Sequence, residues 1–197
     1  MPRLAHRCNL TELSYVRRQI VRLSPKYDLN PIQYIRSHCY SHTMTHQANR
    51  QFLTAHLAIL RASYTHWTGK QLINATLDSQ QAIAALDQAP FAVVSHDTQA
   101  DPIFNYGNQA ALNLFAMSWA EFTALPSRLS AEIINQAERA KLLDRVAQHG
   151  HIENYAGIRI AKSGQRFMIR DATIWNLLNT DGRPYGQAAL IRQWSYL

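Results

Sequence analysis

Short runs of alternating apolar and polar residues fill most of the carboxyl-terminal half of this chain, which is the pattern of β-strands. The first two runs, 90–97 and 101–108, flank a polar turn and predict a hairpin. The remaining runs cover 152–160, 166–177 and 185–194. Serine–glycine and aspartate–glycine pairs between these later runs are typical of tight turns. The pattern predicts an antiparallel sheet in which two strands precede, and three follow, a helical region.

Helical periodicity appears in two places. Between the second and third strands, the predicted helices are 110–115, 119–125 and 131–148. Ahead of the sheet, apolar residues spaced four, three, four and three apart form a stripe along a helix at 47–68, and Gly69 follows as its stop. A shorter helix, 79–88, ends before Pro90. The 47–68 helix either packs on its own domain, which is favoured, or pairs with its copy in a homodimer.

The strand pattern also predicts which residues face the interior. The last strand is apolar on both faces, which is typical of a central strand covered on both sides. In the strand 166–177, one face is expected to point inward. The residues on that face are Phe167, Ile169, Asp171, Thr173, Trp175 and Leu177.

Charge separates the chain into two parts. Residues 1–50 carry eight Lys or Arg against two acidic residues, whereas residues 51–197 carry twelve against eleven. The main domain, 50–197, is therefore nearly neutral, and the segment 1–49 is predicted to be a basic, loosely attached extension. A further hypothesis places the native start at Met44. A nucleic-acid partner is expected only through the basic segment, and no apolar run reaches the ~18 residues that span a membrane.

Cysteine and histidine positions limit the chemistry. Both cysteines, Cys8 and Cys39, precede residue 51, so the main domain excludes a cysteinyl-flavin adduct and a thiolate-bound metal. Zinc is considered only on Cys39, His42 and His46 with Cys8 or His6, and is not favoured. Haem through His96, His149 or His151 is not favoured either, because an isolated loop histidine is usually exposed. No phosphate-binding loop or activated nucleophile indicates an enzyme.

The order strand, strand, helices and three strands is that of a PAS-type sensor domain, and several motifs in sequence resemble the MEKHLA domain family. These motifs are YTHWTG at 64–69, PFAVVSH at 90–96, NYGNQAALNLF at 105–115, LPSRLSAE at 125–132, GIRI at 157–160, SGQRF at 163–167, ATIWNL at 172–177 and GQAA at 186–189, with Trp194 at the end. The resemblance covers about 51–197. It implies an α+β fold with a PAS-like five-stranded antiparallel sheet, helices on one face and a preceding amphipathic helix.

The resemblance also implies a class of function. Such domains occur alone in bacteria and at the end of plant homeodomain-leucine zipper regulators, where they are associated with dimerisation. This chain lacks the homeodomain and zipper, so their transcriptional role is not carried over. The expectation is a non-enzymatic cytoplasmic module that binds a small molecule or a second copy; the alternative is a nucleic-acid-associated regulator that uses the basic segment.

Candidate ligand-binding residues come from the expected interior. Asp171 either orients a ligand or forms an ion pair or hydrogen bond within the domain, and the second reading is favoured because a buried carboxylate needs a partner. Arg128 either binds an anion near the helix 131–148 or pairs with a carboxylate. The aromatic candidates, which either line a cavity or form ordinary core, are Phe91, Phe104, Phe115, Phe122, Phe167 and Trp175.

Overall fold

A five-stranded antiparallel sheet forms the centre of the domain, as the sequence predicted. The computed structural model describes the backbone of residues 31–197 and, outside 133–135, the side chains from residue 50 onward. The strands are β1 (Ala92–His96), β2 (Phe104–Gly107), β3 (His151–Ile160), β4 (Arg166–Leu178) and β5 (Pro184–Tyr196). Their order in the sheet is β2-β1-β5-β4-β3, and every neighbouring pair is antiparallel.

Helices precede the sheet and connect its two halves. They are α2 (Pro31–Thr68), α3 (Ser79–Asp87), α4 (Gln109–Phe115), α5 (Trp119–Phe122), the short 3₁₀ helix η1 (Ser127–Ser130) and α6 (Ile133–His149). α2 therefore begins before the predicted start at 47. Capping boxes at Asp78 and Ser118 satisfy the first N–H groups of α3 and α5. At Gly69, a positive φ of 69° ends α2 where the sequence placed its stop.

The sheet belongs to a compact unit, Leu53–Leu197, and Met1–Phe52 form a second unit. The predictions for the basic extension, for a start at Met44 and for zinc ligands before residue 50 concern side chains outside the described residues. Among the described residues, no helix is long and apolar enough to cross a lipid bilayer.

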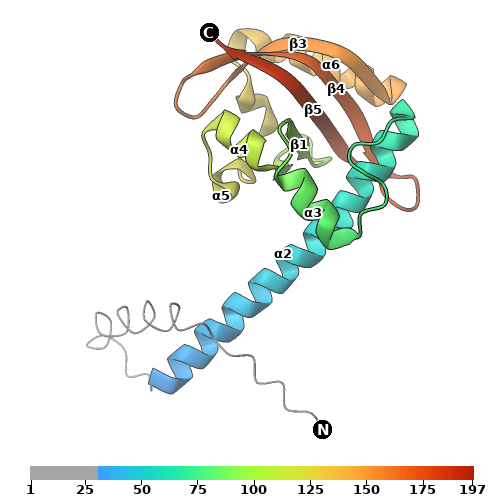
Figure 1. Cartoon of the computed structure of the whole chain (residues 1–197). Helices are drawn as coiled ribbons and strands as arrows, with labels where there is room; N and C mark the ends of the chain where they lie inside the picture. Colours follow the sequence, from blue (N-terminus) through green and yellow to red (C-terminus); the bar gives the residue numbers. More distant parts are fainter. Residues whose placement is uncertain (1–30) are drawn as a thin grey trace. The chain divides into compact units, whose positions relative to one another are not determined.

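Helices cover both faces of the sheet. On one face, the apolar stripe of α2 packs with α3 against β1, β4 and β5, so the helix uses its stripe within its own domain (Figure 1). Leu60 and Tyr64 are fully buried there, and the ring of Tyr64 meets that of Trp175 edge to face at 5.0 Å. A homodimer through this helix would need other residues of α2, and stays a prediction.

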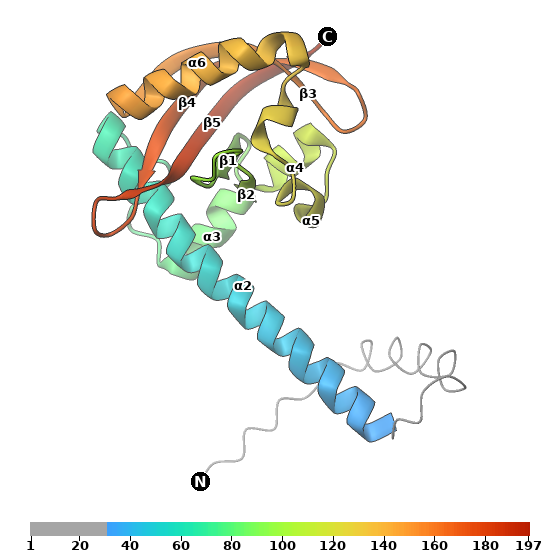
Figure 2. The ribbon, with the colours of Figure 1, turned by 180° about the vertical axis from the view of Figure 1, so that it is seen from behind.

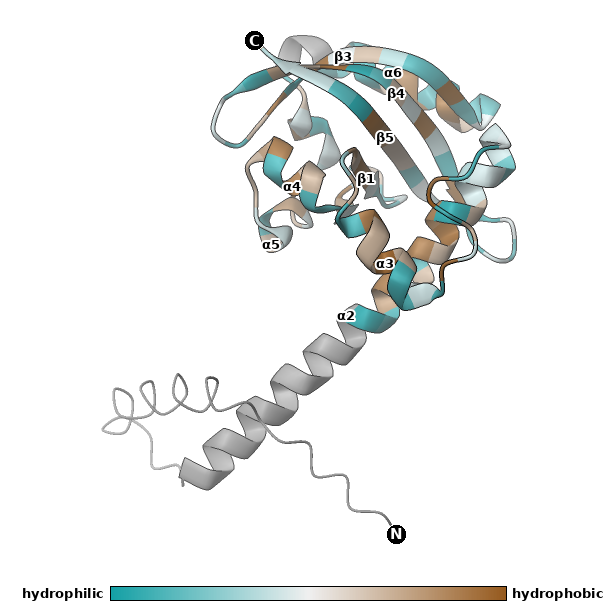
Figure 3. Ribbon diagram, viewed as in Figure 1, coloured by the Kyte–Doolittle hydropathy of each residue, from teal (hydrophilic) through white to brown (hydrophobic). Residues whose placement is uncertain are grey.

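The opposite face carries α4, α5, η1 and α6, which are the helices expected on one side (Figure 2). Val146 of α6 packs against Ile174 of β4, and Phe115 of α4 against Phe167. β5 lies between the two layers, with Leu190 facing α2 and Ile191 facing α4. The prediction of a central strand covered on both sides is thus confirmed, and Figure 3 shows apolar positions along β5.

At Asp171 the alternation of β4 is interrupted, so that residues predicted to share one face lie on opposite faces before and after it. Phe167 and Ile169 point toward α4, but Asp171 takes a left-handed φ of 50°, and beyond it Ala172 rather than Thr173 lies on the α4 side. Asp171 itself is exposed. A residue in this conformation interrupts the two-residue alternation of a strand. The prediction that Asp171 points inward, with or without a buried partner, is wrong.

Candidate functional site

A small cavity lies between the sheet and the helices α4, η1 and α6. Its volume is about 50 Å³. That volume holds roughly three to five water-sized groups, far below the ~300–1,000 Å³ of pockets for drug-sized ligands. The polar residues that line it are Ser95, His96, Ser130, Arg139, Arg159 and Gln187, and the remainder of the lining is apolar. The cavity is therefore small, and its lining combines polar and apolar residues.

Four of the predicted aromatic residues gather beside this cavity. Phe104 stacks on Phe122 with ring centroids 4.3 Å apart, and Phe115 contacts Phe167 edge to face at 5.2 Å. Phe104 and Phe115 line the cavity directly. Phe122 and Phe167 are fully buried behind them. The four rings mainly form core, and two of them also supply cavity wall.

The other two predicted aromatic residues lie elsewhere. Trp175 is fully buried, but on the α2 face of the sheet, since the exchange of faces at Asp171 turns it away from the cavity. Phe91 is half-buried at the edge of that same cluster. The predicted grouping of Trp175 and Phe91 with Phe104 and Phe115 around one cavity is wrong.

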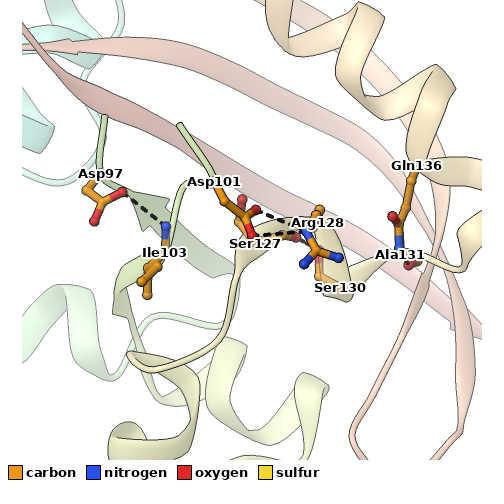
Figure 4. Close-up of polar contacts among 8 residues, drawn as sticks. All are labelled: Asp97, Asp101, Ile103, Ser127, Arg128, Ser130, Ala131 and Gln136. Carbon is orange, nitrogen blue, oxygen red and sulfur yellow. Dashed lines mark hydrogen bonds and ion pairs between the residues drawn. The ribbon is translucent and has the colours of Figure 1, made fainter. Parts of the chain in front are cut away.

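Arg128 is exposed and pairs with a carboxylate, as the favoured alternative stated. Its Nε lies 3.0 Å from one carboxylate oxygen of Asp101 and 3.1 Å from the other (Figure 4). In the same loop region, the backbone N–H of Ile103 donates to Asp97 at 3.0 Å, and Ser130 donates to the Ser127 carbonyl. These contacts fix the loop between β1 and β2 against η1.

An open cleft on the surface shares part of its lining with the cavity. It has a volume of about 790 Å³ and lies between the β1–β2 loop, α6 and the β4–β5 turn. The residues common to cleft and cavity are His96, Arg139, Leu143 and Gln187. The side-chain amide of Gln187 donates to the Leu143 carbonyl at 3.0 Å, which ties α6 to β5 at this point. Arg139 therefore lies where the cleft and the cavity meet.

The charged groups of the cavity are all basic. Arg159 is 7% exposed, and its guanidinium donates to the Ile158 carbonyl and to the Tyr155 hydroxyl. Burial and the nearby positive charge of Arg159 lower the pKa of Arg139 to about 10. Burial also lowers the pKa of His96, whose Nδ1 contacts the Asp97 carbonyl at 2.8 Å. None of the described residues lining the cavity is Asp or Glu.

A hydrogen-bonded chain connects the cavity wall to α2. Ser95, part of the lining, donates its hydroxyl hydrogen to the Asn105 side-chain carbonyl at 2.6 Å. Its oxygen lies 2.8 Å from Nε2 of His56, which is fully buried on α2. Because the single Ser95 hydrogen is already used, His56 donates through Nε2–H. The hydroxyl group of Ser95 therefore links β1, which lines the cavity, to α2.

Sequence reasoning did not select His56, Arg139 or Arg159, and it considered His96 only as a haem ligand, which was not favoured. Alternation with Ile158 and Ile160 would place Arg159 on the outer face of its strand, yet it pairs with Phe167 and shares its inward face. Asn154, with φ of 56°, and the irregular pairing near Tyr155 shift the alternation of β3. The available signal was an arginine between two isoleucines in the run 152–160. His149 is exposed as expected for a loop histidine, whereas His96 is buried.

Comparison with known protein families places the domain. The family model described as MEKHLA domain matches residues 54–196. The chain belongs to the MEKHLA family. This match confirms the resemblance seen in the sequence, and it spans the sheet together with the part of α2 that packs on it.

Curated relatives of this MEKHLA domain include the homeobox-leucine zipper protein HOX32 of Oryza sativa, subspecies indica and japonica. Each is 23% identical over 139 residues, which are 68% of this chain and 16% of the relative. The chain therefore spans about a sixth of the length of these relatives.

Solved structures similar to this MEKHLA domain share its fold. A PAS domain from Colwellia psychrerythraea has a TM-score of 0.52 at 16% identity, over 58% of this chain and 94% of that one. An RNA-binding Light-Oxygen-Voltage receptor has a TM-score of 0.52 at 19% identity, over 62% of this chain and 35% of that one. The likeness shows a PAS-like α+β fold.

Proposed function

We propose that this MEKHLA domain is a non-enzymatic sensory module in which a small molecule bound in the cavity changes how α2 is held on the opposite face of the sheet. One observation carries the proposal: a residue of the cavity wall, Ser95, is hydrogen-bonded to His56 of α2. The cavity is otherwise separated from α2 by the full thickness of the sheet. Ser95 is therefore the point at which occupancy would be communicated.

A second connection supports the same role. The indole N–H of Trp67, on the last turn of α2, donates to the Asn176 carbonyl at 2.9 Å. The side-chain amide of Asn176 donates in turn to the Val146 carbonyl of α6, also at 2.9 Å. A ligand that shifts α6 would move Asn176 and, through it, the hydrogen bond to Trp67 of α2. A ligand can favour one packing of α2 over another only if its contacts differ between the two packings.

Native mass spectrometry of freshly purified protein tests the proposal. We expect one small retained molecule per chain. Replacing Ala189, which lines the cavity, by leucine fills the space and should abolish the retained mass, while Ala120→Leu, an exposed position on α5, should keep it.

Ala189→Leu could fail to fold, because added methylene groups strain a packed core. Ala172→Val, which adds less volume to the same cavity, is therefore the second variant. Wild-type protein without any retained mass, or a retained mass that both cavity-filling variants keep, would contradict the proposal.

A further inference from the structure

Two arginines reach the cavity, and no ion pair among the described residues neutralises either of them. Arg139 enters it from α6 and Arg159 from β3. Within the described part of the chain, the ion pairs are Lys70–Glu153, Arg128–Asp101, Lys162–Glu121 and Arg166–Glu132, and none includes either arginine. A buried guanidinium without a counter-ion is costly, and proteins pair such groups. The counter-ion is therefore expected to come from outside the described residues, and a bound anion would supply it.

The hydrogen-bond donors of these arginines are largely unused. A guanidinium carries five N–H groups. Arg159 uses two of them, on the Ile158 carbonyl and the Tyr155 hydroxyl, and its charge lies 5.5 Å from the centre of the Tyr155 ring. Arg139 makes no hydrogen bond to any described residue. Guanidinium N–H groups that are free to donate bind carboxylate and phosphate oxygens strongly.

His96 adds an unpaired hydrogen-bond acceptor to these unused donors. Its Nδ1 faces the Asp97 carbonyl and so carries the hydrogen, which leaves Nε2 as a bare acceptor. Nε2 is buried and has no hydrogen-bond partner among the described residues. His96 lines the cavity together with Arg139. A ligand that satisfies both carries an anionic oxygen and also a hydroxyl hydrogen, or brings a proton to His96.

We propose that the natural ligand is a small oxyanion, a carboxylate or inorganic oxyanion of about four or five non-hydrogen atoms, held by Arg139 and Arg159, with Nε2 of His96 accepting a hydroxyl hydrogen where the oxyanion carries one. The size follows from the volume of about 50 Å³. The inference rests on the proposed sensory function and specifies the chemistry of its ligand. Arg139 also lines the outer cleft, so the anion passes this guanidinium as it enters.

Amide chemical shifts of the full chain test the inference. Sodium acetate and sodium phosphate are titrated separately at matched ionic strength against sodium chloride. Acetamide serves as a neutral molecule with the shape of acetate. We expect acetate or phosphate to move the amides of the cavity strands in a saturable way, and the stronger of the two identifies the source of the oxyanion. Acetamide and chloride should leave these amides unchanged.

Arg139→Gln should weaken the response by about tenfold or more, because hydrogen bonds to charged groups are among the strongest. Arg145→Gln, an exposed arginine on the same helix, is the matched control and should bind as the wild type does. Without added oxyanion, Arg139→Gln should melt at or above the wild-type temperature, since it removes an uncompensated charge. A purely structural arginine would instead lower the melting temperature.

Two results would overturn the oxyanion assignment. Equal responses to acetate and acetamide would show that binding does not depend on the charge of the ligand. The sensory proposal would remain in place. The absence of a response to every probe would also overturn the assignment. In that case, a molecule retained in native mass spectrometry would show that the sensory proposal holds with a different ligand.

Discussion

Trp175→Ala is expected to lower the free energy of unfolding by about 3–5 kcal/mol, the usual cost of removing a large buried aromatic side chain. Trp175 is fully buried on the α2 face, where it contacts Tyr64. Its removal opens a cavity under α2 that the rigid sheet does not close. Chemical denaturation of the wild type and the variant measures the difference.

Trp175→Phe is the informative control. Phenylalanine keeps a ring against Tyr64 and removes the indole N–H, which is buried without an acceptor among the described residues. We therefore expect a loss of only about 1–2 kcal/mol, since the unsatisfied donor of the wild type already costs stability. A loss below about 1 kcal/mol for Trp175→Ala would contradict the placement of this side chain between β4 and α2.

Acidification is expected to destabilise the domain through His56. Burial lowers its pKa from 6.5 to about 4. As the pH falls from 6.5 toward 4, His56 is therefore protonated in the unfolded state but stays neutral in the folded state. The stability from neutral His56 is fully present above pH 6.5 and decreases as the pH falls through this window. Between pH 7.5 and 5 the expected loss is about 2 kcal/mol.

His56→Gln isolates this contribution. The glutamine amide can still donate to Ser95, but it does not titrate. Between pH 7.5 and 5, the free energy of unfolding of the variant should fall by about 2 kcal/mol less than that of the wild type. Denaturant unfolding of both proteins at each pH measures the difference. Burial also lowers the pKa of His96, which contributes with the same sign in both proteins and cancels in the comparison. Parallel pH profiles for wild type and His56→Gln would contradict a buried, neutral His56.

Local patterns were sufficient to predict the elements of this fold. The stripe on α2, the turn glycines and the apolar run of β5 each reflect interactions between residues close in sequence. The central position of β5 also followed from its pattern, because a strand apolar on both faces needs cover on both. The motif order then identified the family and, with it, the topology.

The candidate site was predicted less well, for identifiable reasons. Strict alternation placed Asp171 and Trp175 on one inward face, but the left-handed conformation of Asp171 exchanges the faces of β4. The shift in β3 likewise hid Arg159 from the pattern. The link from His56 to Ser95 joins residues 39 positions apart, and no local periodicity reports such a pair. Alternation holds only while the backbone keeps its extended geometry.

Amide hydrogen exchange along residues 53–68 tests the central claim most directly, namely that occupancy of the cavity is communicated to α2. The comparison is between protein that carries its retained molecule and the same protein stripped of it by unfolding and refolding. We predict slower exchange around His56 in the loaded protein, and no such difference in Ser95→Ala. Protection confined to the cavity strands and α6, with identical exchange along 53–68 in both forms, would contradict the account.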